Sequence, residues 1–73
     1  MARLRVLSGH QARLIVESQG FVEVRRRGSH VVMQRRLAES TITVPVPDHP
    51  ELKTGTLLSI IRQSGIPRRE CEA

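Results

Sequence analysis

The sequence predicts an α+β fold in which one helix, three antiparallel strands and a second helix follow each other. Three observations support this order: a helix-capping pattern at residues 8–11, alternating apolar and polar residues between 21 and 46, and apolar residues at helical spacing from 57 to 61. A small antiparallel sheet buries one face under helices and leaves the other to solvent or a ligand. We therefore expect both helices on one face of a three-stranded sheet, and functional residues on the open face.

A capping box predicts the first helix. Ser8 is followed three positions later by Gln11, the spacing at which each side chain can bond the backbone N–H of the other residue. The apolar residues that follow form a narrow stripe, so this helix depends on packing against other elements. Gly20 is typical of the left-handed residue after a helix, and the expected helix covers about residues 9–19.

Residues 21–27 and 30–37 predict a hairpin. In the first run, β-branched residues alternate with charged ones, and Gly28 with Ser29 supplies the turn before the second run. These two segments therefore form the first two strands.

A third strand is expected over residues 41–46. Pro45 and Pro47 lack the N–H group that an inner strand donates, so the strand must lie at an edge of the sheet or end there. The proline-containing segment 47–53 opposes regular structure and is expected to be a loop.

Apolar spacing predicts the second helix. Leu57, Ile60 and Ile61 recur at i, i+3 and i+4 and so share one helical face. Gly65 is typical of the residue that follows a helix, and Pro67 prevents extension of the helix.

The length of 73 residues predicts a single domain over residues 1–73, with its core at 8–67 and a flexible tail at 68–73. Cys71 has no partner for an intrachain disulfide bond, which is unusual for a small secreted protein. No apolar run approaches the roughly 18 residues of a membrane helix, and the first residues lack the apolar segment of a signal peptide. We therefore expect a cytoplasmic protein without membrane contact.

The charge of the chain predicts an anionic partner. The net charge is +5, and eleven of the 12 basic residues are arginine, which binds phosphate and carboxylate groups through two parallel hydrogen bonds. The partner is then a nucleic acid or an acidic protein. Aromatic residues make up only 1% of the chain, which excludes an RNA-binding surface built on stacked aromatic rings.

Five of the basic residues surround the predicted hairpin turn. These hairpin arginines are Arg25, Arg26, Arg27, Arg35 and Arg36. Their charge would attract a phosphodiester and hold it through bidentate contacts. The alternative is a solvated arginine-rich surface without a ligand.

His30 is the candidate acid–base residue, because imidazole can accept and donate a proton near neutral pH. Strand alternation places Val31 and Met33 toward the core and His30 on the open face. The alternative is a structural surface histidine. We assign no chemistry to His10, in the first turn of a helix. His49, in the proline-rich loop, either orients RNA or is only a turn residue.

Lys53 precedes a helix whose free N–H groups would bind a phosphate; alternatively it marks an ordinary helix start.

The histidines and Cys71 share no metal-ligand spacing, so no metal site is predicted. The chain also lacks a glycine-rich phosphate loop, a carboxylate pair on one helix face and a nucleophile elbow. These absences exclude nucleotide hydrolases, glycosidases and serine hydrolases, and we expect no cofactor.

Several short motifs occur together in a specific order. They are Gly20-Phe21, Arg27-Gly28-Ser29-His30, Thr43-Val44-Pro45-Val46-Pro47 with His49, and the segment from Lys53 through Gly55-Thr56-Leu57 to Gly65. Through them, residues 8–67 resemble the HicA toxins of bacterial and archaeal toxin–antitoxin pairs. The resemblance implies a double-stranded-RNA-binding-domain-like fold, whose order of helix, three strands and helix agrees with the order predicted above.

The resemblance also implies an endoribonuclease that cleaves mRNA and is held inactive by a HicB-type antitoxin. It assigns His30 as the catalytic histidine, with Gly28 and Ser29 as turn residues and phosphate contacts. We expect metal-independent transesterification that leaves a 2′,3′-cyclic phosphate. The alternatives are an RNA-binding module without catalysis and a domain that only binds another protein.

The chain departs from the family pattern at three positions. Asp48 stands where a basic residue often precedes the loop histidine, which weakens any RNA role for His49. Gln19 and Ser64 are polar at helix positions that are commonly apolar or alanine, so a looser core is expected.

Overall fold

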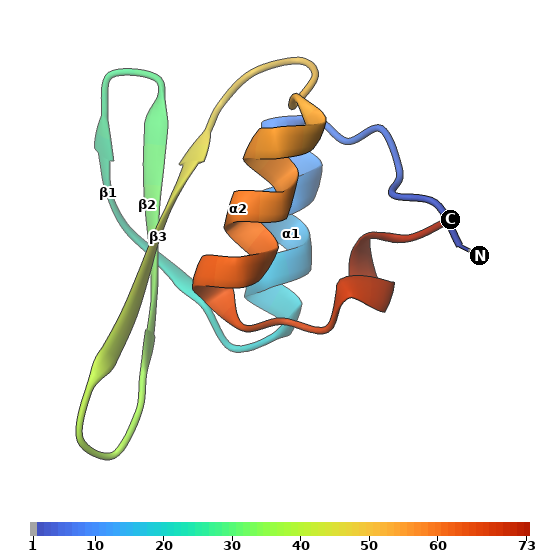
Figure 1. Ribbon diagram of the computed structural model, residues 1–73. Coiled ribbons are helices and arrows are strands. Elements are labelled where there is room, and N and C mark those ends of the chain that lie inside the picture. The colour runs from blue at the N-terminus through green and yellow to red at the C-terminus, as the bar shows by residue number, and fades with distance from the viewer. Residues whose placement is uncertain (1) are drawn as a thin grey trace.

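The computed structural model describes residues 2–73. Its elements are α1 (Gly9–Ser18), β1 (Val22–Arg27), β2 (His30–Arg36), β3 (Thr41–Pro47), α2 (Thr54–Ser64) and a short 3₁₀ helix, η1 (Arg68–Cys71). The strands form one antiparallel sheet in the order β1-β2-β3, and both helices cover the same face of it (Figure 1). The predicted α+β fold is confirmed, and the opposite face of the sheet is open.

The N-terminus of α1 has the predicted capping box. The Ser8 hydroxyl accepts a hydrogen bond from the Gln11 N–H at 3.0 Å, and Gln11 Oε1 accepts one from the Ser8 N–H at 2.9 Å. The helix ends at Ser18, and Gly20 then turns the chain into β1 with a left-handed φ of 95°. Local sequence signals therefore set both ends of this helix.

β2 is the central strand, and alternate residues of it point to opposite faces of the sheet. Val31 and Met33 are fully buried beneath the helices, as predicted, and so are their partners Val46 and Val44 on β3. Together with residues of both helices these four side chains form the core.

β3 is an edge strand, as its prolines predict. Pro45 lies opposite Val32 and Pro47 opposite His30, so the strand continues one residue beyond the expected end. An edge strand tolerates proline because the missing N–H need not reach a further strand.

A register shift in β1 determines which of its residues face the helices. Glu23 lies opposite Met33 and Arg25 lies opposite Val32, so Val24 is an extra residue that forms a β-bulge. Beyond the bulge, Arg25 and Arg27 share the open face with Val32 and His30, whereas Arg26 is on the helix side. Without this extra residue, Glu23 would lie on the same face of the sheet as Arg25 and Arg27.

The two polar helix residues that predicted a looser core both have partners. Ser64 is 2% exposed, and its hydroxyl donates to the Ile61 carbonyl at 3.3 Å and accepts from the Ile66 N–H at 3.4 Å. Gln19 Nε2 donates to Glu70 Oε1 at 3.4 Å. Both polar groups are therefore satisfied by hydrogen bonds.

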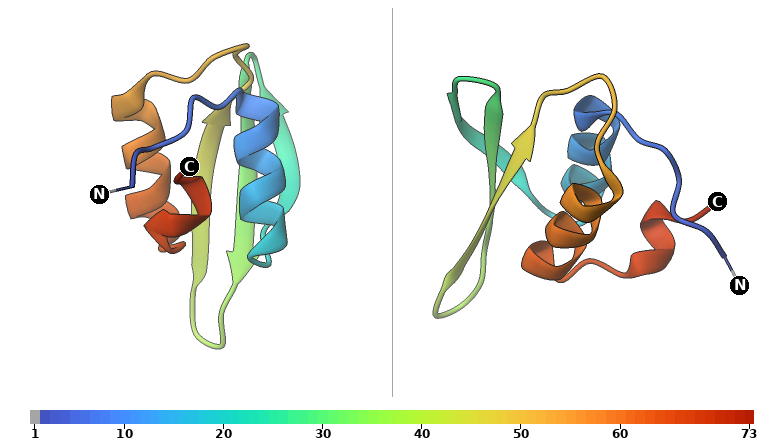
Figure 2. Two further views of the ribbon diagram at one scale, coloured as in Figure 1. Left: turned by 90° about the vertical axis from the view of Figure 1, so that its right-hand side faces the viewer. Right: turned by 45° about the horizontal axis from the view of Figure 1, so that its top comes forward.

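The prediction of a flexible tail at residues 68–73 is wrong. Cys71 is 1% exposed and belongs to the core, and this burial raises the pKa of its thiol. The Cys71 carbonyl accepts from the Arg5 N–H at 2.8 Å, and the Ala73 N–H donates to the Arg3 carbonyl at 2.9 Å. The two terminal segments therefore pair with each other, as Figure 2 shows. Cys71 is the one apolar residue of this segment, beside five charged or small residues, so no local pattern predicts that the segment packs on the core.

The loop after β3 is held against both α1 and the hairpin turn. The Gly9 N–H donates to the His49 carbonyl at 2.8 Å, and a Cβ atom at Gly9 would overlap the carbonyl group of Pro47. On the other side of the loop, the Asp48 N–H donates to the Ser29 carbonyl at 2.6 Å. This loop therefore connects the start of α1 to the turn that precedes His30.

The side chain of Asp48 adds an ion pair to that connection. Arg26 Nη1 donates to Asp48 Oδ2 at 2.8 Å, and this hydrogen bond holds the pKa of the Asp48 carboxyl below its ordinary value of 3.8. Asp48, which departs from the family pattern, thus pairs with one of the hairpin arginines. Both groups are well exposed, so the pair supplies geometry more than stability.

Replacing Gly9 by alanine should lower the free energy of unfolding by about 1–3 kcal/mol, because the added methyl group displaces the Pro47 carbonyl. Gly55→Ala is the matched control, because a Cβ atom at Gly55 meets no atom within 4 Å. It should raise the free energy of unfolding by about 0.4–1 kcal/mol. Urea unfolding of both variants measures the difference, and equal stabilities would contradict the close contact at Gly9.

Replacing Asp48 by asparagine should lower stability at neutral pH and have no effect in strong acid. The folded-state pKa of Asp48 is lowered, so its contribution is complete above the unfolded value near 3.8 and is lost as the pH falls through the folded value. Urea midpoints of the wild type and the variant, measured across the acid range, should therefore converge below pH 3.8. A difference that is independent of pH would show that the charge of Asp48 is not the cause.

Candidate functional site

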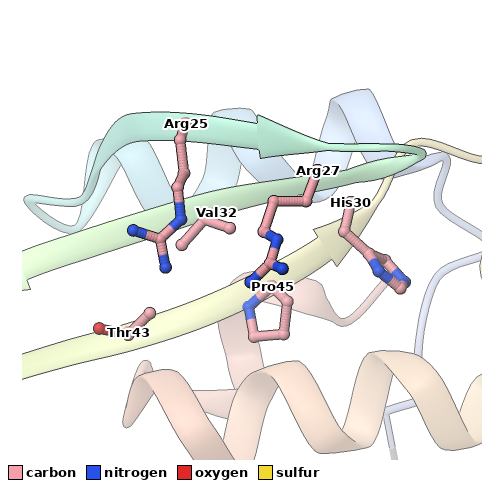
Figure 3. A pocket seen from close by; sticks show the side chains of 6 residues that line it. All are labelled: Arg25, Arg27, His30, Val32, Thr43 and Pro45. Atoms are coloured by element: carbon pink, nitrogen blue, oxygen red, sulfur yellow. The ribbon is translucent and has the colours of Figure 1, made fainter.

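A hollow of about 340 Å³ lies on the open face of the sheet. Six residues line this open-face hollow: Arg25 and Arg27 of β1, His30 and Val32 of β2, and Thr43 and Pro45 of β3 (Figure 3). All three strands contribute, so the site depends on the register of the whole sheet.

Cross-strand pairing arranges five of the six lining residues in two rows, and Thr43 lies in the row beyond them. Arg27 lies opposite His30 in one row, and Arg25, Val32 and Pro45 lie opposite each other in the next. The rows are two residues apart along β2, which corresponds to about 7 Å at the rise of a β-strand. His30 therefore stands at one end of the hollow, close to the hairpin turn.

The arginine side chains cover part of the open face. Figure 3 shows Arg25 and Arg27 extending from β1 across β2 toward β3. Val32 is only 7% exposed although no helix lies over it, because these side chains and its β3 neighbours surround it. The face therefore combines an apolar floor with two cationic walls.

The positive charge of the hollow is not neutralised by neighbouring carboxylates. Within residues 2–73, the ion pairs are Arg13–Glu23, Arg26–Asp48 and Arg68–Glu72, and none includes Arg25 or Arg27. Two guanidinium groups can bind a phosphodiester, and an exposed imidazole beside them can exchange a proton with a neighbouring hydroxyl group.

His30 is positioned by the turn that precedes it. Gly28 has a left-handed φ of 59°, which suits glycine, and the Ser29 carbonyl is bonded to the Asp48 N–H. His30 follows directly as the first residue of β2, with its exposed ring on the open face beside Arg27. Gly28 and Ser29 therefore hold the turn, and their contact with phosphate stays a prediction.

The structure separates the hairpin arginines into different environments. Arg26 pairs with Asp48 on the helix side, and Arg35 lies opposite Ile42 on that same side. The stem of Arg35 packs beside Gly20, where a Cβ atom would stand 3.6 Å from Arg35 Cδ. Arg26 and Arg35 therefore do not line the hollow, although the sequence grouped them with Arg25 and Arg27.

The other two predicted cations also lie outside the hollow. Arg36 faces the open side but pairs with Thr41 at the end of the sheet remote from His30. Lys53 is the residue before α2, and its side chain makes no capping hydrogen bond there. Neither lines the hollow, and their contact with phosphate stays a prediction.

Three lining residues were missed by the sequence analysis: Val32, Thr43 and Pro45. Alternation already places Thr43 and Pro45 on the face opposite the buried valines of β3. Only the pairing of β3 with β2 places Pro45 opposite Val32 and Thr43 in the next row, opposite Gln34.

The other histidines are away from the hollow. His10 Nδ1 lies 2.9 Å from Arg13 Nη2, and Arg13 in turn pairs with Glu23. His49 is in the loop after β3, and its carbonyl group accepts the hydrogen bond from the Gly9 N–H.

In the part of the chain that the structure describes, no three side chains of the metal-ligating types His, Cys, Asp and Glu come together. No helix among residues 2–73 has the length and apolar character to cross a membrane.

Comparison with known proteins shows the family to which the chain belongs. Neither the curated proteins nor the solved structures contain a match to this chain. A family model does match, and it is described as the HicA toxin of bacterial toxin–antitoxin systems. The match covers residues 9–66, which extends from the first residue of α1 to just beyond α2 and includes every residue of the hollow. The chain therefore belongs to the HicA toxin family.

Proposed function

We propose that this protein is a metal-independent endoribonuclease that cleaves mRNA in the cytoplasm, with His30 as its acid–base residue. The observation that supports this proposal is the position of His30 beside Arg27 at the end of the open-face hollow. The imidazole is exposed, and next to it stands a guanidinium group that has no carboxylate partner among residues 2–73.

The proposed reaction is an internal transesterification. The ribose 2′-oxygen attacks the phosphorus, a new bond forms between them, and the bond from phosphorus to the 5′-oxygen breaks. His30 either removes the proton of the 2′-hydroxyl or supplies one to the leaving 5′-oxygen. The products are a 2′,3′-cyclic phosphate and a 5′-hydroxyl end.

Arg27 and Arg25 are proposed to stabilise the charge that develops on the phosphate oxygens. Guanidinium groups bind two oxygens at once and keep their charge at every physiological pH. The preformed hydrogen-bond donors of such a site contribute a large part of catalysis in related chemistry. The remaining hairpin arginines would act at longer range, by raising the local concentration of RNA.

A toxin of this family is expected to have an antitoxin partner, and we propose a HicB-type antitoxin that covers the open face. The uncompensated charge of Arg25 and Arg27 suits an acidic surface. Covering His30 would block access of RNA, so one surface would serve both activity and inhibition.

A non-catalytic RNA-binding module is the second candidate. The observation that favours it is that the residues lining the hollow include a single imidazole, whereas two proton-transfer groups are ideal for this reaction. The same hollow would then bind RNA without cleaving it.

His30→Ala should lower the rate of RNA cleavage by about 10²- to 10⁴-fold, because it removes the proton-transfer group. RNA affinity should change little. The measurement is cleavage of a long unstructured RNA in EDTA, with the 3′ ends of the fragments identified. His49→Ala is the matched control and should cleave like the wild type. Equal cleavage by the His30 variant would remove His30 from the mechanism, and no cleavage by the wild type would support the binding module.

Arg25→Gln and Arg27→Gln should each lower the salt dependence of RNA binding. A lost phosphate contact reduces the slope of log K against log salt by about 0.7 for a single strand. Arg62→Gln removes the same charge from the exposed surface of α2, and it should leave the slope nearly unchanged. Fluorescence anisotropy at several salt concentrations measures the slope for the wild type and for each of the three variants. Equal slopes would show that RNA does not contact the hollow.

A further inference from the structure

We propose that the part of the open-face hollow between Arg25 and Thr43 is a subsite for one unpaired RNA base, next to the phosphate held at His30 and Arg27. This inference rests on the proposed function, because it requires RNA to lie on this face. It adds a specificity site to a reaction that otherwise needs only phosphate and ribose.

The floor of the hollow has the wrong chemistry for phosphate alone. Val32 and Pro45 lie opposite each other in the row beyond His30 and are both apolar, although the face around them is cationic. Val32 is 7% exposed, so the exposed ring of Pro45 provides most of the apolar surface that a ligand can contact. A phosphate gains nothing from apolar contact, whereas the flat face of a base does. Two chemical environments in one hollow therefore indicate two parts of a nucleotide.

The walls of the hollow can replace aromatic stacking. The one aromatic residue of the chain, Phe21, is buried in the core and cannot reach RNA. Bases also stack on the planes of arginine guanidinium groups. Arg25 crosses β2 above Val32, so a base on this floor would lie beside its guanidinium group (Figure 3).

Thr43 lies one row beyond the floor, opposite Gln34, and supplies a hydrogen-bond donor at the outer edge of the hollow. Gln34 Nε2 donates to Thr43 Oγ1 at 3.2 Å, so the threonine oxygen is already an acceptor in this pair. A hydroxyl group has one hydrogen to donate, and that hydrogen remains for a ligand. An oxygen or ring nitrogen on the edge of a base would accept it.

The spacing of the two rows fits consecutive parts of one strand. The row of Arg27 and His30 and the row of Arg25, Val32 and Pro45 are separated by about 7 Å along β2. This is the length scale of a single nucleotide in an extended chain. A phosphate at the first row would therefore place a neighbouring base over the second.

The subsite selects single-stranded RNA. In an A-form duplex the base faces are stacked and the edges are paired, so neither is available to the floor or to Thr43. Only an unpaired nucleotide can turn its base onto the sheet.

The test uses short 2′-O-methyl RNA strands that contain one ribonucleotide and can therefore be cut at one phosphate. Two further strands lack the base on the 5′ or the 3′ side of that phosphate. For the wild type, loss of one of these bases should slow cleavage about tenfold, as expected for a stacked base. Annealing the intact strand to its complement should slow cleavage at least as much.

Thr43→Val removes the hydroxyl group with little change of shape, and it should slow cleavage of the intact strand roughly two- to tenfold. It should also reduce the penalty for the missing base, because the two changes remove the same contact. Thr43→Ser should restore the wild-type rate. Thr41→Val is the matched control on the same face of β3, opposite Arg36 and outside the hollow, and should behave like the wild type.

The outcomes separate this inference from the proposed function. If the wild type cleaves all strands equally and Thr43→Val has no effect, the base subsite is wrong and the endoribonuclease stands. If the wild type cleaves none of them, the proposed activity is wrong, and binding of fully 2′-O-methylated strands then decides the subsite. Equal affinity for strands with and without the bases would overturn it, and weaker binding without one base would support it.

Discussion

The register between β1 and β2 is the constraint on which the rest of the structure depends. Successive residues of a strand face opposite sides, so the single extra residue at Val24 reverses the faces of everything on one side of it. Because of this bulge, Glu23 reaches Arg13 on the helix side, while Arg25 and Arg27 extend over the open face. Of the three consecutive arginines, Arg26 then pairs with Asp48 on the helix side, and Arg25 and Arg27 line the hollow.

The helix side and the open side of the sheet use their charges differently. On the helix side, two cations are paired: Arg13 with Glu23 and Arg26 with Asp48, in contacts that connect α1, the hairpin and the loop after β3. On the open face, Arg25 and Arg27 have no carboxylate partner within residues 2–73. The ion pairs that connect elements of the domain therefore lie on the helix side, and the two arginines without a carboxylate partner lie on the open face.

The features with local causes could be predicted well. The capping box at Ser8 and the left-handed glycines Gly20 and Gly65 set helix ends through bonds within a few residues. Strand alternation placed Val31 and Met33 in the core and His30 on the open face, and the prolines of β3 placed it at an edge. The family resemblance found from short motifs agrees with the family match over residues 9–66.

The sequence by itself determined the types and order of α1, α2 and the three strands, and the face of His30, because each follows from contacts within about one turn or one strand. Only the tertiary structure decided which arginines accompany His30, since a bulge and a cross-strand register are properties of two strands together. It also decided that Thr43 and Pro45 complete the hollow and that Cys71 enters the core. Those contacts join residues far apart in the chain, and the local pattern of either partner carries no sign of the other.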